Sequence, residues 1–165
     1  MKVLDIIETD FVNYKKPCMT IMFPFCSFKC DIEAGKRVCQ NSGFASADIV
    51  EVDRDEIIQR YLDNPVTEAV VMQGLEPFDS FDDLYSFIYK FTEVCNDDIV
   101  IYTGYREDEI DDAVDDLCSI VENNKVIIKF GRFIPNGKPV FDETLGVTLQ
   151  SSNQYARVVH YDKGI

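Results

Sequence analysis

Three cysteines lie close together in residues 23–41, which read FPFCSFKCDIEAGKRVCQN. Three residues separate Cys26 from Cys30, and eight residues separate Cys30 from Cys39. Thiolates at such spacing bind metal, and a gap of three residues suits neighbouring corners of an iron-sulfur cluster. Such clusters commonly take four cysteines, so three would leave one iron free for another ligand, as catalysis requires.

Two simpler interpretations of the cysteine set remain open, a zinc site and reduced structural cysteines. Zinc normally takes four ligands, and the single histidine, His160, lies far away near the C-terminus. We expect His160 to face solvent on the last strand. Cys18, Cys95 and Cys118 fall in strand or helix patterns and are expected to be small core residues.

Composition indicates a single globular domain, residues 1–165. Hydrophobic residues make up 46% of the chain and charged residues 28%, as in ordinary soluble proteins. No apolar run reaches the length of a membrane span, and the N-terminus, MKVLDIIETD, is too acidic for a signal peptide. We therefore expect a cytoplasmic protein, in which reduced thiols favour metal binding over disulfides.

The formal net charge is −14, from 30 acidic and 16 basic residues. Because such a charge repels phosphate, we expect neither nucleic acid nor an anionic membrane as a partner. The acidic run at residues 107–116 is interpreted as a solvated helix face, with a docking surface for a partner as the alternative.

Apolar segments of strand length alternate with helical patterns. The predicted strands are residues 18–23, 69–72, 99–102 and 126–129. The first predicted helix begins at Asp53, and its inner face is formed by Ile57, Ile58, Tyr61 and Leu62. The second begins at Asp79 or Ser80, with Leu84, Phe87, Ile88 and Phe91 on its inner face. The third begins near residue 107, with Ile110, Val114, Leu117 and Val121 on its inner face. This alternation predicts an α/β fold with a parallel sheet. Four strands are too few for a closed eight-stranded barrel, so we expect a partial (βα) barrel or an open curved parallel sheet.

The ends of the chain have weaker patterns. Residues 3–7 are expected to form an edge strand or a hairpin arm, and residues 155–161 a closing strand. Asn136-Gly137 is a hairpin signal. The cysteine segment contains several turn-forming residues and is expected to be irregular.

Three groups of residues follow predicted strands. Right-handed crossovers put the C-terminal ends of parallel strands on one edge, where α/β proteins bind ligands. Residues 25–26, 74–76 and 103–105 all fall at that edge. We therefore expect them to form one site.

Four ordered motifs carry a resemblance to a known family. They are the cysteine set, Gly74-Leu75-Glu76-Pro77, Tyr102-Thr103-Gly104-Tyr105 and Ser151-Ser152-Asn153-Gln154. Together they resemble the radical S-adenosylmethionine (SAM) proteins, and among these the activating proteins of anaerobic ribonucleoside-triphosphate reductase. The resemblance covers roughly residues 10–158 and implies a fold of the radical SAM type.

The resemblance implies that Cys26, Cys30 and Cys39 hold a [4Fe-4S] cluster whose fourth iron is chelated by SAM. The reduced cluster would cleave SAM to a 5′-deoxyadenosyl radical, which takes a hydrogen atom from a glycine of the partner enzyme. The residues that would surround SAM by this resemblance are Val38, Gly74, Leu75, Glu76, Pro77, Tyr102, Thr103, Gly104, Ser152 and Asn153.

The chain departs from the family pattern at two places. Eight residues precede Cys39 where the family has two, and Leu75 replaces a glycine. The longer loop costs about 1.2 kcal/mol of closure entropy, whereas thiolate-metal sites contribute on the order of 10 kcal/mol. The insertion is therefore compatible with a cluster.

The function that the resemblance implies is a radical SAM activase that generates a glycyl radical on anaerobic ribonucleotide reductase. Its partners would be the large subunit of that enzyme and an electron donor such as flavodoxin, ferredoxin or thioredoxin. A non-catalytic iron-sulfur or SAM-binding scaffold is the alternative. A radical SAM enzyme acting on a small molecule is a third interpretation, disfavoured because the short chain leaves little protein to enclose a substrate.

Overall fold

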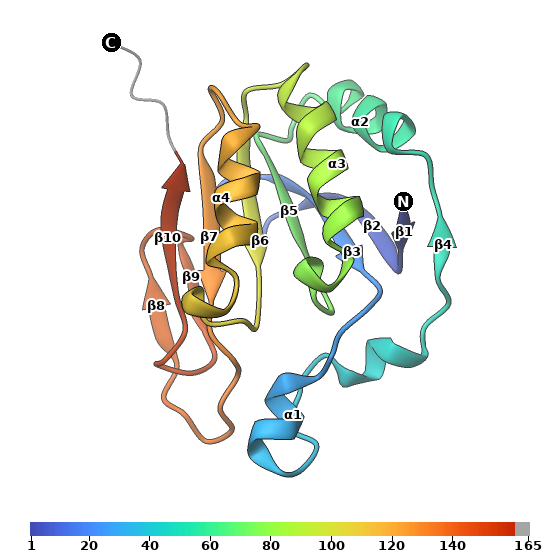
Figure 1. The fold of residues 1–165 in the computed structure, drawn as a ribbon. Coiled ribbons are helices and arrows are strands. Elements are labelled where there is room, and N and C mark those ends of the chain that lie inside the picture. The colour runs from blue at the N-terminus through green and yellow to red at the C-terminus, as the bar shows by residue number, and fades with distance from the viewer. Residues whose placement is uncertain (161–165) are drawn as a thin grey trace.

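A six-stranded sheet forms the centre of the protein in the computed structural model, which describes residues 1–160 (Figure 1). The strand order is β10-β7-β6-β5-β3-β2. The four central strands are β3 (Cys18–Phe23), β5 (Ala69–Gly74), β6 (Asp98–Tyr102) and β7 (Val126–Phe130). They pair in parallel, and nearly all their residues are buried, as expected for strands covered on both faces.

The sheet is mixed and not wholly parallel, because both outer strands run antiparallel to their neighbours. β2 (Asp5–Asp10) pairs with β3, and β10 (Tyr155–His160) pairs with β7. Only residues 11–17 connect β2 to β3, and a parallel crossover needs a dozen or more residues. β2 is therefore the predicted edge strand. The predicted last strand ends at His160 within the described residues, and Tyr161 lies outside them.

Three helices cover one face of the sheet (Figure 1). They are α2 (Arg54–Asp63), α3 (Phe81–Thr92) and α4 (Asp111–Ser119), and their apolar faces join the larger core cluster. Leu62 is the exception, because it is exposed. Asp53 caps α2 by accepting a hydrogen bond from the Asp55 amide at 2.7 Å, as predicted. α3 instead follows a 3-10 helix, η2 (Pro77–Ser80), and the Ser80 side chain makes no capping bond.

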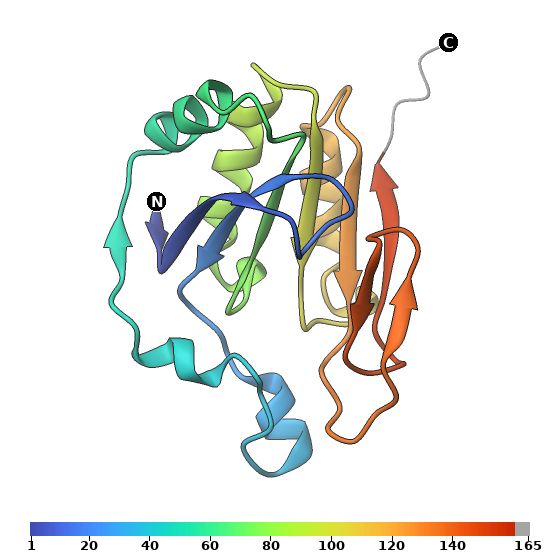
Figure 2. The ribbon, with the colours of Figure 1, turned by 180° about the vertical axis from the view of Figure 1, so that it is seen from behind.

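The other face carries a smaller apolar cluster. Figure 2 shows the chain between β2 and β3 crossing this face of the sheet. Residues 11–17 and a hairpin of β8 (Val140–Asp142) and β9 (Val147–Leu149) contribute to this cluster. The hairpin turn is at residues 143–146, so the prediction of a hairpin at Asn136-Gly137 is wrong. Asn136 does adopt a left-handed conformation (φ 62°), but no strands flank this turn.

The remaining elements are short. β1 (Lys2–Val3) pairs with β4 (Val50–Glu51), and η1 (Ser42–Ser46) and η3 (Glu107–Glu109) are single 3-10 turns. The cysteine segment contains a helix, α1 (Lys29–Ala34), where we had expected irregular backbone. None of the helices within residues 1–160 has the length and apolar character of a membrane span.

Of the cysteines outside the close set, Cys18 is a core residue as predicted, whereas Cys95 and Cys118 are half-buried. Cys18 is fully buried, and Cys95 and Cys118 pack against the larger cluster. His160 is half-buried at the end of β10, where its Nε2 lies 3.3 Å from the Glu122 carbonyl oxygen.

Candidate metal centre

The C-terminal ends of the parallel strands border a cavity of about 390 Å³. Its walls include all three cysteines of the close set, together with Gly74, Leu75, Glu76, Tyr102, Thr103 and Gly104. Residues separated by up to 78 positions in the sequence thus share one site, at the sheet edge that the topology predicts.

Cys26 and Cys30 reach the cavity through a tight turn after β3. The Phe28 amide donates to the Cys26 sulfur at 3.2 Å. Phe28 itself has φ 51°, an uncommon conformation for a bulky residue, and its carbonyl accepts from the Asp31 and Ile32 amides to start α1. This turn places Cys30 on the first turn of the helix.

Burial raises the pKa values of these thiols. The pKa of Cys26 rises to about 11 and that of Cys30 to about 12, with smaller contributions from neighbouring groups that include Cys39. With these pKa values, Cys26 and Cys30 are protonated at neutral pH in the metal-free protein, so metal binding must displace their protons.

The donor set fits a polynuclear iron-sulfur group. Within residues 1–160, no three His, Cys, Asp or Glu side chains converge to hold a single metal ion. Three soft thiols instead border one cavity, which is the arrangement needed when each thiolate binds a different iron of a cluster.

Glu76 links the ends of β5 and β6. Its side chain is buried and accepts hydrogen bonds from the Phe78 amide at 3.2 Å, the Thr103 hydroxyl at 2.8 Å and the Gly104 amide at 2.8 Å. Burial nevertheless raises the pKa of this carboxyl to about 7. The carboxyl group thus holds the Thr103–Gly104 backbone at the cavity wall.

Gly74 is required by close backbone packing. It has φ 100°, and a Cβ at this position would lie 2.8 Å from the Phe23 amide nitrogen. Its carbonyl accepts from the Asn41 side-chain amide at 2.8 Å. A carbonyl oxygen has a second lone pair, so it can still accept from a ligand.

Lys129 is a cavity residue that our sequence reasoning missed. Its ammonium group is buried and donates to the carbonyls of Thr103 at 3.3 Å and Gly131 at 3.0 Å. Burial lowers its pKa to about 8, an effect that the nearby Glu76 opposes. The available signal was a lysine within the otherwise apolar strand segment at residues 126–130.

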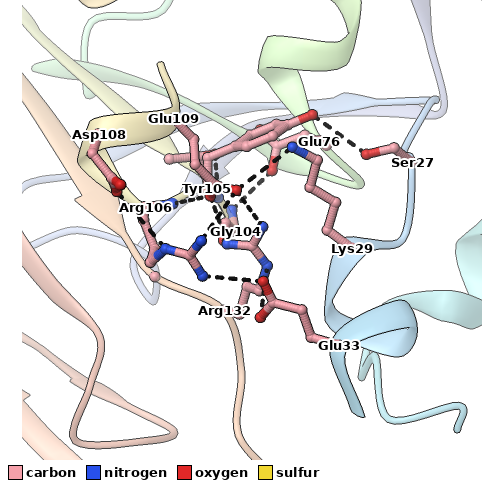
Figure 3. Close-up of polar contacts among 12 residues, drawn as sticks. Ser27, Lys29, Glu33, Glu76, Gly104, Tyr105, Arg106, Asp108, Glu109 and Arg132 are labelled. Carbon is pink, nitrogen blue, oxygen red and sulfur yellow. Dashed lines mark hydrogen bonds and ion pairs between the residues drawn. The ribbon is translucent and has the colours of Figure 1, made fainter. Parts of the chain in front are cut away.

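An ion-pair network joins α1 to the sheet edge (Figure 3). Arg132, whose side chain is 6% exposed, donates to both carboxylate oxygens of Glu109, at 2.6 and 2.7 Å. Its Nε lies 3.3 Å from Glu33 on α1, and Lys29 on the same helix lies 3.6 Å from Glu109. Since α1 has no buried residue, these charges hold the helix against the body of the protein.

Four residues proposed from the resemblance do not line the cavity: Val38, Pro77, Ser152 and Asn153. Pro77 is buried in η2, and Ser152 and Asn153 are exposed. The Asn153 side chain donates to the Arg132 carbonyl at 2.7 Å. From this motif only the next residue, Gln154, lines the cavity.

Comparison with protein families identifies the group to which this geometry belongs. A family model described as a 4Fe-4S single cluster domain matches residues 18–155, which include the four parallel strands and all three cavity cysteines. Comparisons with curated proteins and with solved structures return no match. The chain belongs to the 4Fe-4S single cluster domain family.

Proposed function

We propose that this protein is a radical SAM activase, with a fold of the radical SAM type, that generates a glycyl radical on a partner enzyme. The observation that carries the proposal is the shared cavity. Three thiols, the Gly74–Glu76 strand end and the Thr103–Gly104 loop border one space. Cluster binding alone requires only the thiols, whereas the other two walls suit a second ligand beside the cluster.

Cys26, Cys30 and Cys39 would hold the [4Fe-4S] cluster. When bound, it supplies one electron and an iron with an open coordination position. The buried Lys129 ammonium is suited to the carboxylate of SAM, because it has three donors and only two of them meet protein carbonyls. The carbonyl of Gly74 and the backbone beside Leu75 would accept from the amino group.

The proposed substrate is a glycine of a protein, namely the large subunit of anaerobic ribonucleotide reductase. The cavity lies at an edge of the sheet, where a segment of a second protein can approach. We further propose a cytoplasmic location and an external one-electron donor such as flavodoxin, ferredoxin or thioredoxin.

The decisive experiment is anaerobic reconstitution with iron and sulfide, followed by dithionite and SAM. We expect 5′-deoxyadenosine from the wild type and from Cys95→Ala, which changes a cysteine outside the cavity. Cys26→Ala should yield none. No product above background from wild-type protein that holds about four irons per chain would refute the proposal.

A non-catalytic iron-sulfur or SAM-binding scaffold is the second candidate. Two observations favour it: Asn41 already uses one of the two lone pairs of the Gly74 carbonyl, and the Leu75 side chain lies where the resembling family has glycine. A bound cluster and measurable SAM binding without 5′-deoxyadenosine would identify this function. Lys129→Met distinguishes binding of SAM from binding of the cluster, because it should weaken SAM binding and leave the iron content unchanged.

A further inference from the structure

Asp31 accepts three hydrogen bonds from the chain that returns from α1 to the cavity. Its main-chain carbonyl accepts from the Lys36 amide at 3.2 Å. One side-chain oxygen, Oδ1, accepts from the Val38 amide at 2.7 Å and from the Cys39 amide at 2.8 Å. Asp31, next to Cys30, therefore fixes the chain that leads to Cys39 relative to α1, while the Asn41 side chain fixes the chain after Cys39 to the Gly74 carbonyl.

The segment between Cys30 and Cys39 has little else to hold it in place. α1 has six residues, too few for a stable isolated helix, and none of them is buried. Gly35 ends the helix with φ 65°, and no atom lies within 4 Å of the position that its Cβ would occupy. Residues 32–37 are all exposed. Apolar packing thus cannot set the position of Cys39.

The ion-pair network described above acts on the other side of the helix. Glu33 and Lys29 join α1 to Arg132 and Glu109, but neither contacts the residues that follow Gly35. Fixing α1 therefore does not by itself fix residues 36–39, in which the Arg37 Nε also donates to the Ser42 hydroxyl at 2.8 Å. The Asp31 carboxylate is the described group that joins this returning segment to the helix.

We propose that Asp31 is a positioning residue for the metal centre. Its hydrogen bonds fold the eight-residue segment so that the Cys39 thiol lies at the cavity beside Cys30. The family that this chain resembles usually has a shorter gap before the third cysteine. The role of Asp31 explains how this chain forms the same thiol set with a gap of eight residues. The inference concerns assembly of the cluster site and holds whether or not SAM is cleaved.

The side chain chemistry gives a graded set of variants. Asp31→Asn keeps an oxygen at Oδ1 that can accept both amides, whereas Asp31→Ala removes it. Asp48→Ala is the matched control, because Asp48 is exposed and makes no hydrogen bond or ion pair among residues 1–160. It removes the same charge from a nearby segment.

The first measurement uses metal-free protein. Diamide takes two hydrogen atoms from two nearby thiols, which form a disulfide while diamide becomes the hydrazine. Trypsin cleaves after Lys29 and Arg37, so the three cysteines fall in separate peptides and mass spectrometry identifies the linked pair. Asp31→Ala should slow the Cys30–Cys39 linkage by about tenfold, because a freely moving loop lowers the effective concentration of the thiol. Asp31→Asn and Asp48→Ala should stay within about twofold of wild type.

The second measurement is the iron and sulfide content after anaerobic reconstitution, with the electron paramagnetic resonance spectrum of the reduced protein. Asp31→Ala should lose cluster to the same extent as Cys39→Ala, and Asp31→Asn should restore the wild-type content and spectrum. Wild-type linkage rate and iron content in Asp31→Ala would overturn the proposal. So would loss in Asp31→Asn equal to that in Asp31→Ala, because the carboxylate charge and not the hydrogen bonds would then be required.

Discussion

The contact between Glu109 and Arg132 predicts a measurable loss of stability on a single substitution. Glu109→Gln removes the charge that faces a guanidinium whose side chain is only 6% exposed. Arg132 would keep Glu33 as its remaining carboxylate partner, at 3.3 Å from Nε. We therefore expect the variant to be destabilised and the contact between α1 and the sheet edge to weaken.

The size of the effect follows from the pKa of Glu109. Arg132 holds that pKa at about 2, compared with an ordinary value of 4.5. At about 1.4 kcal/mol per pKa unit, the difference between 4.5 and about 2 corresponds to at most about 3.5 kcal/mol. Because the Glu109 side chain is still 17% exposed and glutamine retains one acceptor for Arg132, we expect a loss of about 2 kcal/mol.

Urea unfolding of the reduced, metal-free protein measures this loss. Glu107→Gln is the matched control, since Glu107 lies in the same 3-10 turn and pairs with the exposed Arg157, a contact worth at most about 1 kcal/mol. A carboxyl group whose pKa is lower in the folded state than in the unfolded state stabilises the folded protein at pH values above its unfolded-state pKa. The difference between wild type and Glu109→Gln should therefore be constant from about pH 6 to 8 and shrink below about pH 4.5. A loss no larger than that of Glu107→Gln, or one that changes between pH 6 and 8, would refute the reasoning.

Three further substitutions test the cavity walls. Gly74→Ala should destabilise the protein by about 2 kcal/mol or more in urea unfolding, because φ is 100° and the new Cβ would lie 2.8 Å from the Phe23 backbone. Gly43→Ala is the control and should change the stability little, because no atom lies within 4 Å of the added Cβ. Because burial raises the pKa of Glu76 to about 7, this carboxyl contributes stability below about pH 4.5 that is lost as the pH rises to 7. The wild-type urea midpoint should fall over that interval, and an equal fall in Glu76→Gln would contradict this assignment. Tyr102→Phe removes the 2.6 Å hydrogen bond to the Asn13 carbonyl and should lower the thermal midpoint by about 3 °C, which corresponds to about 1 kcal/mol. An unchanged midpoint would show that this hydrogen bond does not help to hold residues 11–17 in place.

Much of the fold follows from local patterns in the sequence. β3 spans the same residues as the apolar run that predicted it, and the other three parallel strands differ from the prediction by one or two residues. These strands are apolar on both faces and are bounded by turn-forming residues, so their limits are encoded locally. The cysteine set and the strand-end glycine could be predicted for the same reason, because parallel strands carry their C-terminal ends to one edge.

Other features depended on contacts between distant residues. α1 was not predicted, since its six residues, none of them buried, have no apolar periodicity, and the contacts with Arg132 and Glu109 lie about 80 to 100 positions away. Lys129 could not be assigned to the cavity from its own segment, because its role depends on carbonyls of residues 103 and 131. Ser152 and Asn153 were predicted to lie near SAM but are exposed, whereas Gln154 of the same motif lines the cavity. The motif therefore predicted the correct segment but the wrong residues.

The sequence by itself predicted that the three thiols and the ends of the parallel strands meet at one edge of a sheet, because residue type and spacing are enough for that expectation. Only the tertiary structure decided which residues face the cavity and how Cys39 returns to it. The physical reason is that residues 31–38, four of them charged and none of them buried, cannot specify a path by apolar packing, whereas one carboxylate oxygen on Asp31 with two amides within 2.8 Å does.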